Sequence, residues 1–333
     1  MKWTSGYDRV MKLGGLALAL LIELSLAPML QAQAPTLSKE YIRLGGRILA
    51  IEQAVSLGYT APVYETWNYL NTAPDSGWTG SGTWVVVGAG DFDRNGVPDL
   101  VYMNTSTRQV TVNYYGGANG DTIIGWAYLN AAGSPGWTVV AVADMNGDGV
   151  PDLIWQDSAT SYVTVNYYGG AGGATLIGWN WLRQVNNSGW TVVGAADFDS
   201  NGTPDLVWQN TSTTAVTVNY YGLVSGVPTF TGWNWLNEAG SPGWTVRGAA
   251  DMNGDGVPDL IWENNSTGQV TVNFYGGAGG AVLQGWQYLR NGVGSPGWLV
   301  VALADFNGNG TPDLVWQQMA SPYAVTVNYY GPG

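Results

Sequence analysis

The chain has 333 residues, of which 45% are hydrophobic and only 11% are charged, and its net charge is −13. This apolar content is enough for one large core or two ordinary ones. The acidic balance excludes a basic groove for nucleic acid. The chain contains no cysteine and no histidine, so thiol nucleophiles, histidine general bases and zinc sites of the usual kind are excluded. Its 49 glycines, 18 tryptophans and 19 tyrosines favour an all-β protein with many tight turns.

Residues 1–34 have the pattern of a secretion signal peptide. Lys2, Arg9 and Lys12 precede an apolar run from Leu13 to Leu30, and small residues follow at positions 32 and 34. We therefore predict a secreted or cell-surface protein with no membrane span once the signal is cleaved. The alternative is an uncleaved membrane anchor, but the run is short for one and is interrupted by a charge.

Residues 35–64 are predicted to form a short β-hairpin and a linker. Glu40–Leu44, a Gly-Gly pair and Arg47–Glu52 follow each other as strand, two-residue turn and strand. The stretch resembles the short hairpins of bacterial YD/Rhs-type surface proteins. An isolated hairpin is marginally stable, so self-association through residues 40–52 is one role that it could have.

Residues 65–333 repeat. The first aspartate of a recurring loop falls at Asp91, Asp144, Asp197, Asp251 and Asp305, so successive copies lie 53 or 54 residues apart. Each repeat holds four strand-like runs; in the third they are 190–195, 205–209, 215–221 and 232–236. Four short antiparallel strands in such a period predict an all-β, five-bladed β-propeller of four-stranded blades. A row of β-sandwich domains would need about 100 residues a unit.

The two ends of the repeat region complement each other. The fourth-strand motif occurs at Trp126, Trp179, Trp233 and Trp286 but is missing after the last repeat, and an extra copy, Trp67–Leu70, precedes the first. We therefore predict that the N-terminal strand completes the last blade, which closes the ring and removes its open edge. Trp67 is expected to be a buried residue of that seam.

The loops share the pattern D-x-(D/N)-x-(D/N)-G-x-P-D. Side-chain oxygens fall at positions 1, 3, 5 and 9, the glycine at position 6 permits a sharp turn, and position 7 can add a carbonyl oxygen. Calcium prefers six to eight such ligands, so about five calcium sites are predicted, with the fifth loop weakest because it has two carboxylates. The alternative is Asx-turns without metal. The candidate ligands are Asp91, Asp93, Asn95, Val97 and Asp99; Asp144, Asn146, Asp148, Val150 and Asp152; Asp197, Asp199, Asn201, Thr203 and Asp205; Asp251, Asn253, Asp255, Val257 and Asp259; and Asp305, Asn307, Asn309, Thr311 and Asp313.

Each loop lies between a GW-x-V-x-x-A segment and a P-D-L-(V/I)-W segment. Over residues 78–330 this arrangement resembles the FG-GAP/VCBS repeats of integrin-α-type propellers. The resemblance implies calcium in the loop that joins the first two strands of each blade. It also implies an adhesive or carbohydrate-binding role. Integrin-type propellers commonly have seven blades, whereas this sequence shows five, so no ligand site is carried over.

Aromatic residues and asparagines recur at fixed repeat positions. Most of the tryptophans are expected to fill the space between blades, although some could face a groove and stack on sugar rings. The third-strand asparagines are expected to pair with buried backbone groups rather than with sugar hydroxyls. The recurring positions are Trp137, Trp190, Trp244 and Trp298 before the loop; Trp155, Trp208, Trp262 and Trp316 after it, with Tyr102 in the first repeat; Trp179, Trp181, Trp233 and Trp235 in fourth strands; and Asn113, Asn166, Asn219, Asn273 and Asn328.

Three functions are compatible with these features. The leading one is a secreted binding module for extracellular carbohydrate or a surface protein. The second is a structural subunit of an extracellular assembly that docks by strand addition through the hairpin. The third, a glycoside-active enzyme, needs two carboxylates facing each other across a substrate, and no such pair stands out among the acids outside the loops, so the chain is expected not to be an enzyme. Those acids are Glu40, Glu52, Glu65, Asp75, Asp121, Asp157, Glu238 and Glu263.

Overall fold

The computed structural model describes residues 40–44, 47–52, 61–72, 83–186, 188–289 and 294–333. The chain divides into two compact units, residues 1–58 and 59–333. The signal-peptide prediction and the hairpin's Gly-Gly turn lie outside the described residues. Within the described part, no helix has the length and apolar character needed to cross a membrane.

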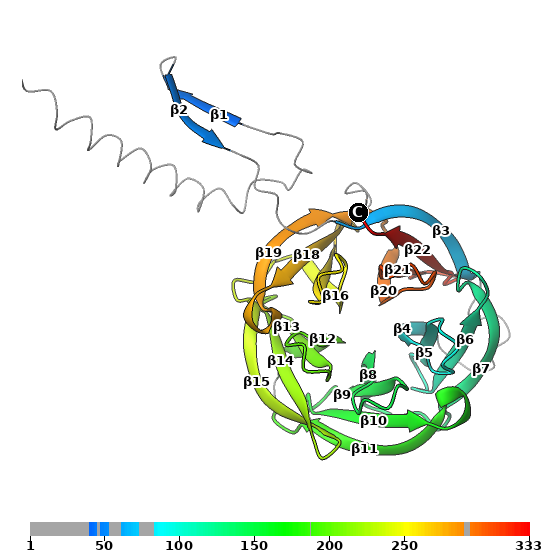
Figure 1. Cartoon of the computed structure of the whole chain (residues 1–333). Coiled ribbons are helices and arrows are strands. Elements are labelled where there is room, and N and C mark those ends of the chain that lie inside the picture. The colour runs from blue at the N-terminus through cyan, green and yellow to red at the C-terminus, as the bar shows by residue number, and fades with distance from the viewer. Residues whose placement is uncertain (1–39, 45–46, 53–60, 73–82, 187, 290–293) are drawn as a thin grey trace, which may run out of the picture. The chain divides into compact units, whose positions relative to one another are not determined.

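The second unit is a ring of five four-stranded antiparallel sheets (Figure 1), which confirms the predicted five-bladed propeller. In four blades the strands follow each other in sequence from the centre of the ring to its perimeter, and in the last blade the perimeter strand comes from the start of the propeller chain. The blades are β4 (Trp84–Gly90), β5 (Asp99–Asn104), β6 (Val110–Gly116) and β7 (Thr122–Asn130); β8 (Trp137–Ala143), β9 (Asp152–Asp157), β10 (Val163–Gly169) and β11 (Thr175–Arg183); β12 (Trp190–Ala196), β13 (Asp205–Asn210), β14 (Val216–Val224) and β15 (Val227–Asn237); β16 (Trp244–Ala250), β17 (Asp259–Asn264), β18 (Val270–Gly276) and β19 (Val282–Tyr288); and β20 (Trp298–Ala304), β21 (Asp313–Gln318), β22 (Val325–Gly331) and β3 (Val63–Asn71). Short 3₁₀ turns, η1 (Ala171–Gly173) and η2 (Ala278–Gly280), precede β11 and β19.

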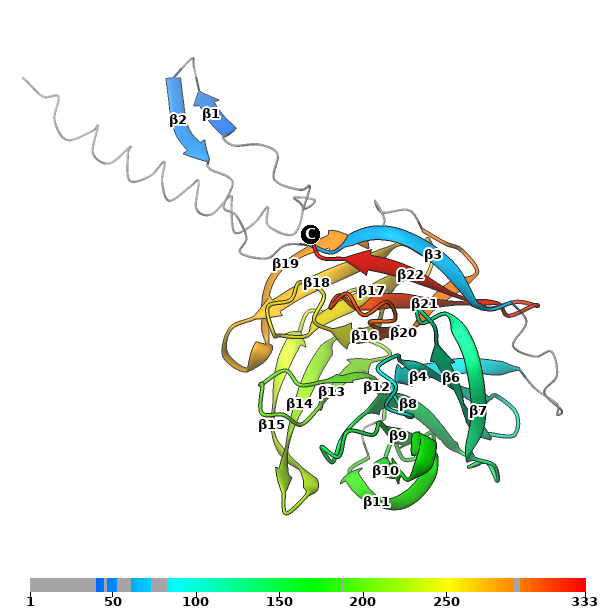
Figure 2. The ribbon, with the colours of Figure 1, turned by 45° about the vertical axis from the view of Figure 1, so that its right-hand side comes forward.

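The last blade is completed by the start of the propeller chain. β3 pairs antiparallel with β22, from Val63 opposite Gly331 to Asn71 opposite Val325. In Figures 1 and 2, β3 lies along β22 at the perimeter, as β7 lies along β6 in the next blade. The predicted closure is therefore confirmed, and it leaves no open sheet edge at the seam.

The second and third strands form the core of every blade. In β5 all six residues are buried, and β9, β13, β17 and β21 repeat this burial up to their last residue. Both faces of these strands are covered because a neighbouring blade packs on each side of the sheet. Near-continuous runs such as Leu-Ile-Trp therefore replace the alternating pattern of a one-sided sheet.

Side-chain amides join neighbouring blades near the centre of the ring. Gln156 on β9 accepts a hydrogen bond from the backbone N–H of Val192 at 3.1 Å and donates to the carbonyl of Trp190 at 2.9 Å. Gln209 on β13 makes the same pair of bonds to Val246 and Trp244 of the following blade. Each amide satisfies buried backbone groups of an inner strand, which fixes the position of one blade against the next.

The first unit contains the predicted hairpin. β1 (Glu40–Leu44) and β2 (Arg47–Glu52) pair antiparallel, with Glu40 opposite Glu52. They form a two-stranded sheet without a third strand among the described residues.

The tryptophans divide by strand. Those on the second strands are buried as expected, with Trp208 1% and Trp155 2% exposed. Those on the fourth strands are not: Trp126, Trp179 and Trp233 are each 55% exposed. The expectation that Trp67 is buried is also wrong, because this side chain is 48% exposed. The residue of β3 that enters the core is Leu70 at 4% exposure. The fourth strand lies at the perimeter, so the side chains on its outer part have no further strand to cover them.

Candidate functional site

The five aspartate-rich loops connect the first strand of each blade to the second, as predicted. The aspartate at position 1 organises the turn: Asp91 accepts the N–H of Asn95 at 3.0 Å and that of Gly96 at 2.8 Å. Gly96 has a φ of 87°, and the equivalent glycines of the other loops have φ values from 83° to 88°. This left-handed conformation explains why every loop has glycine at position 6.

The aspartate at position 9 connects the loop to the third strand. Asp99 is fully buried, and its carboxylate accepts the N–H of Phe92 at 2.9 Å and the N–H of Tyr115 at 2.8 Å. Asp152, Asp205, Asp259 and Asp313 make the corresponding bonds in their own blades.

Burial also changes the acidity of the position 9 carboxyls. Desolvation raises the pKa of Asp99, Asp152, Asp205 and Asp313 to about 7, and that of Asp259 to about 8, against the lowering effect of the backbone N–H donors. Their ionised forms are therefore costly without a compensating charge. A bound cation in the loop would supply that charge.

Position 5 takes two forms. In the first, third and fifth loops it is an asparagine whose amide donates to a third-strand carbonyl: Asn95 to Tyr115 at 2.7 Å, Asn201 to Tyr221 at 2.7 Å and Asn309 to Tyr330 at 2.8 Å. In the second and fourth loops it is an aspartate, Asp148 or Asp255, which accepts from the position 3 asparagine, Asn146 or Asn253, at 3.1 Å. The position 7 residues all donate their N–H to the position 5 side chain; they are Val97, Val150, Thr203, Val257 and Thr311.

Two loops bring three carboxylates to one point. One oxygen each of Asp91, Asp93 and Asp99 lie within 4.8 Å of one another, and Asp197, Asp199 and Asp205 form the same cluster in the third blade. Both clusters combine buried and partly exposed carboxylates, and such oxygens are the ligands that calcium prefers. These two triads can therefore hold a metal ion. In the other three loops position 3 is asparagine, so this position adds no carboxylate to those of positions 1 and 9.

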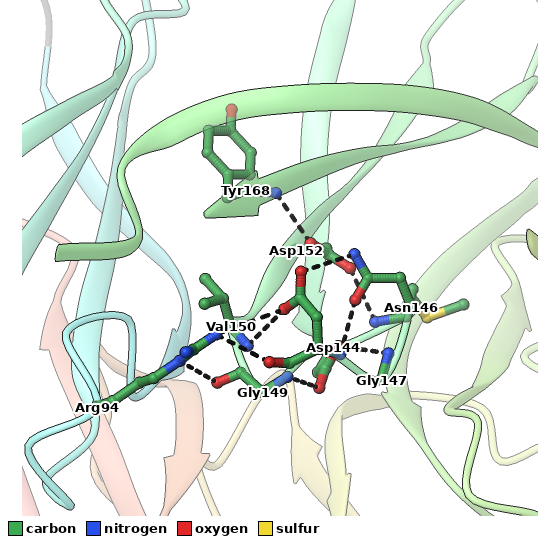
Figure 3. A network of polar contacts seen from close by, with 10 residues as sticks. Arg94, Asp144, Asn146, Gly147, Gly149, Val150, Asp152 and Tyr168 are labelled. Carbon is green, nitrogen blue, oxygen red and sulfur yellow. Dashed lines mark hydrogen bonds and ion pairs between the residues drawn. The ribbon is translucent and has the colours of Figure 1, made fainter. Parts of the chain in front are cut away.

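Neighbouring loops are also connected, which the sequence did not indicate. Arg94, at position 4 of the first loop, donates to the backbone carbonyls of Asp148 at 2.8 Å and Gly149 at 3.3 Å, and its guanidinium lies 3.9 Å from the Asp148 carboxylate (Figure 3). The positively charged side chain of Arg94 thus connects the first loop to the second.

The fourth strands carry a second recurring feature, a pair of aromatic side chains two residues apart. Each pair meets edge to face, with ring centroids 5.2 to 5.6 Å apart. Edge-to-face contact is the preferred geometry of aromatic pairs. The pairs are Trp67 with Tyr69, Trp126 with Tyr128, Trp179 with Trp181, Trp233 with Trp235, and Trp286 with Tyr288.

Two of these pairs line cavities. A cavity of about 590 Å³ lies at the third blade, where Trp190, Trp208, Asn219, Trp233 and Trp235 meet the end of β11. A cavity of about 260 Å³ lies at the equivalent place on the fifth blade, lined by tryptophans of three strands together with Ser295, Thr326 and Asn328. An aromatic wall with a few polar groups is typical of small-ligand sites.

Polar atoms in these grooves are only partly satisfied. The indole N–H of Trp316, which lines the fifth-blade cavity, is buried and has no hydrogen-bond partner, and the same holds for Trp155 and Trp262 on other blades. In the third blade the indole N–H of Trp208 has a partner, the side chain of Asn219. With its oxygen toward the two donors, Asn219 accepts from Trp208 at 3.3 Å and from Arg183 at 2.9 Å. At this position the expected pairing of the asparagine with backbone is wrong.

The fold and the loops together define a β-propeller built from aspartate-loop repeats. A family model described as "FG-GAP-like repeat" matches residues 91–155, 144–208 and 251–316, which together make up more than half of the chain. Each match runs from the first aspartate of one loop to the second-strand tryptophan of the next blade. The chain belongs to the FG-GAP-like repeat family, which confirms the resemblance seen in the sequence.

The comparisons with individual proteins are more distant. No curated protein matches the chain. Among solved structures, the chain is similar to the Tc holotoxin pore of Photorhabdus luminescens (14% identity, TM-score 0.40). The match covers 81% of this chain but only 15% of the toxin chain. It is also similar to the rhamnogalacturonan lyases YesW (11% identity, TM-score 0.38) and PL11 of Bacillus licheniformis (13% identity, TM-score 0.35). Each of these two matches covers 87% of this chain and 79% of the lyase. At such TM-scores the similarity carries no argument about function.

Proposed function

We propose that this chain is a secreted, calcium-stabilised binding module that recognises extracellular carbohydrate. The observation that carries the proposal is the aromatic pair at the same place on all five blades. Half-exposed tryptophan next to buried, unpartnered indole N–H groups suits a ligand with both an apolar face and hydroxyl oxygens, and a sugar ring has both. A surface protein that presents such groups is the other ligand in this class.

Calcium is proposed in all five loops, with the ligands listed above from positions 1, 3, 5, 7 and 9. The two carboxylate triads support this most directly, and the raised pKa values of the position 9 carboxyls support it in every blade. When bound, the ion supplies positive charge at a point where each loop meets the third strand. The metal is therefore assigned a structural role in holding the blades, and the sugar is assigned to the grooves.

We propose binding rather than catalysis, because two of the acids outside the loops already have structural partners. Glu263 is buried and accepts from Arg247 at 2.8 Å and from the N–H of Val300 at 3.2 Å. Asp157 accepts from the backbone and hydroxyl of Thr160, which lower its pKa. Such carboxylates are poorly placed to act as an acid and base pair across a sugar.

A structural subunit is the second candidate. The hairpin β1–β2 is a sheet of two strands, and its backbone edges could accept a strand from another copy. In this reading the protein polymerises as its concentration rises, and deleting residues 36–52 abolishes that behaviour.

A glycan array with the full chain, in calcium and in chelator, tests the proposed function. We expect binding to a subset of glycans, competition by free sugar, and a weaker signal on substituting Trp233→Ala, whose ring is exposed and whose removal leaves the core intact. Val224→Ala, at an exposed apolar position outside the aromatic pairs, is the matched control. Silence across the array, with a folded and calcium-loaded protein, would contradict carbohydrate binding.

A further inference from the structure

The residue that follows the fourth-strand leucine is not the same in every blade. It is asparagine at Asn71, Asn130 and Asn237, and arginine at Arg183 and at Arg290, of which Arg290 lies outside the described residues. Asn130 and Asn237 cap their own loops: each donates to a serine hydroxyl four residues on, at 2.8 and 2.9 Å, and accepts the N–H of a glycine at 3.0 Å. Arginine cannot accept these bonds, so the side chain of Arg183 is free to extend away from its own loop.

Arg183 extends into the neighbouring blade. Its guanidinium carbon lies 5.5 Å from the ring centroid of Trp208, and one terminal nitrogen is 2.9 Å from the Asn219 oxygen. Stacking on an indole and one amide bond hold the guanidinium plane in a fixed orientation. The Nε–H remains buried without a partner. A positioned guanidinium with an unsatisfied donor is well suited to bind a carboxylate, because its donors match the spacing of two carboxylate oxygens.

The groove around Arg183 supports this chemistry. Arg183 is the only charged residue among the described residues that line the cavity, although the chain as a whole carries a net charge of −13. The cavity is about 590 Å³. The exposed rings of Trp233 and Trp235 form the adjacent wall.

We propose that the groove between the second and third blades binds a saccharide that carries a carboxylate, and that Arg183 recognises the carboxylate. The sugar ring packs on the Trp233 and Trp235 wall, and the carboxylate accepts from the guanidinium. The inference rests on the proposed carbohydrate binding and assigns a ligand class to one of its sites.

The test compares methyl glucuronoside and methyl galacturonoside with methyl glucoside and methyl galactoside, titrated into the full calcium-loaded chain and followed by tryptophan fluorescence and calorimetry. We expect the uronosides to bind at least about tenfold more tightly, since hydrogen bonds to charged groups are stronger than neutral ones. The preference should weaken as sodium chloride rises, because salt screens the charge.

Arg183→Asn introduces the residue that three other blades carry at this position, so folding should be retained, and the uronoside preference should fall to near one. Arg183→Lys, which keeps the charge but not the fork of donors, should retain part of it. Arg108→Asn removes a positive charge elsewhere, at a φ of 60° that asparagine tolerates, and should leave the preference unchanged.

The outcomes separate the two proposals. Equal binding of acidic and neutral glycosides, or a preference that survives Arg183→Asn, would overturn the role of Arg183 but leave carbohydrate binding intact. Failure of every glycoside to bind, together with a silent array, would overturn both. If Arg183→Asn lowers the melting temperature, the salt dependence and the uronoside preference of the unmodified chain still decide the matter.

Discussion

The side-chain oxygen of Gln317 accepts a hydrogen bond from the backbone N–H of Val86 at 2.9 Å, although 231 residues separate them. The amide nitrogen of Gln317 donates to the carbonyl of Trp84 at 3.0 Å. The last blade is thus attached to the first by the same two bonds that Gln156 and Gln209 make between consecutive blades. Ring closure therefore depends on this amide as well as on β3.

Gln317→Met should destabilise the ring. Methionine has a similar volume and occupies the equivalent position of the first blade as Met103, but it leaves the Val86 N–H and the Trp84 carbonyl without this partner. A buried unsatisfied group costs about 1–3 kcal/mol, so we expect a loss of that size in urea unfolding. Gln318→Met, at the more exposed end of β21, should change stability by less than about 0.5 kcal/mol. Equal effects of the two substitutions would show that the amide bonds contribute nothing specific.

A chain that begins at residue 77 should fail to form a stable monomer. It lacks β3, so β22 becomes an exposed edge that can pair with another molecule. We expect a lower melting temperature and higher oligomers in size-exclusion chromatography. A chain that lacks residues 35–60 keeps β3 and should remain folded. A monomeric chain from residue 77 with an unchanged melting temperature is incompatible with closure by β3.

Within β3, the side chain that faces the core should contribute more than the one that faces solvent. Leu70→Ala should cost about 2–5 kcal/mol, as expected for a buried leucine. Trp67→Ala should cost about 1 kcal/mol or less, because its ring is half exposed. Denaturant unfolding of the two variants measures the difference. A larger cost for Trp67→Ala would mean that the ring packs against more than the structure describes.

The two carboxylate triads make a reciprocal test of the metal sites possible. Asp93→Asn gives the first loop the ligand pattern of the fifth, and Asn307→Asp gives the fifth loop the pattern of the first. Because calcium affinity depends on the number of charged ligands, the first change should weaken one site about tenfold, roughly 1.4 kcal/mol, and the second should strengthen one. Calcium titration by calorimetry measures both. Identical calcium binding in both variants and the unmodified chain would argue against metal in these loops.

The pH dependence of stability should change sign with calcium. The position 9 carboxyls have folded-state pKa values raised to about 7 or 8 by burial. A raised pKa means that the folded, metal-free protein holds protons that the unfolded chain releases near pH 4. The stabilisation is therefore largest below that pH and is lost as the pH rises through 7 to 8, by about 1.4 kcal/mol per pKa unit for each carboxyl.

Melting curves of metal-free protein from pH 5 to pH 8.5 should show a falling melting temperature, whereas calcium, which binds the ionised form, should remove or reverse the fall. Asp313→Asn, which is neutral at every pH, should reduce the metal-free slope. A metal-free melting temperature that rises over this range would contradict the raised pKa values.

The repeat made much of this protein predictable from its sequence. Fivefold recurrence of the Asp91-type loop fixed the number of blades and the strands on either side of each loop, because turn residues and strand residues recur at constant spacing. The displaced motif Trp67–Leu70 predicted the closure of the ring, because four fourth strands for five third strands leave one partner to be found. These are local properties of the chain, repeated often enough to exclude the alternatives.

Tertiary structure decided what each recurring side chain touches. The sequence could not tell exposed Trp233 from buried Trp208, because both lie in similar strands and only their places at the perimeter and in the interior of the blade distinguish them. It could not show that Gln317 bonds to a strand 231 residues away, or that Arg183 lies over a tryptophan of the next blade. Such contacts form between segments that only the closed ring brings together, and no pattern along the chain encodes the distance between them.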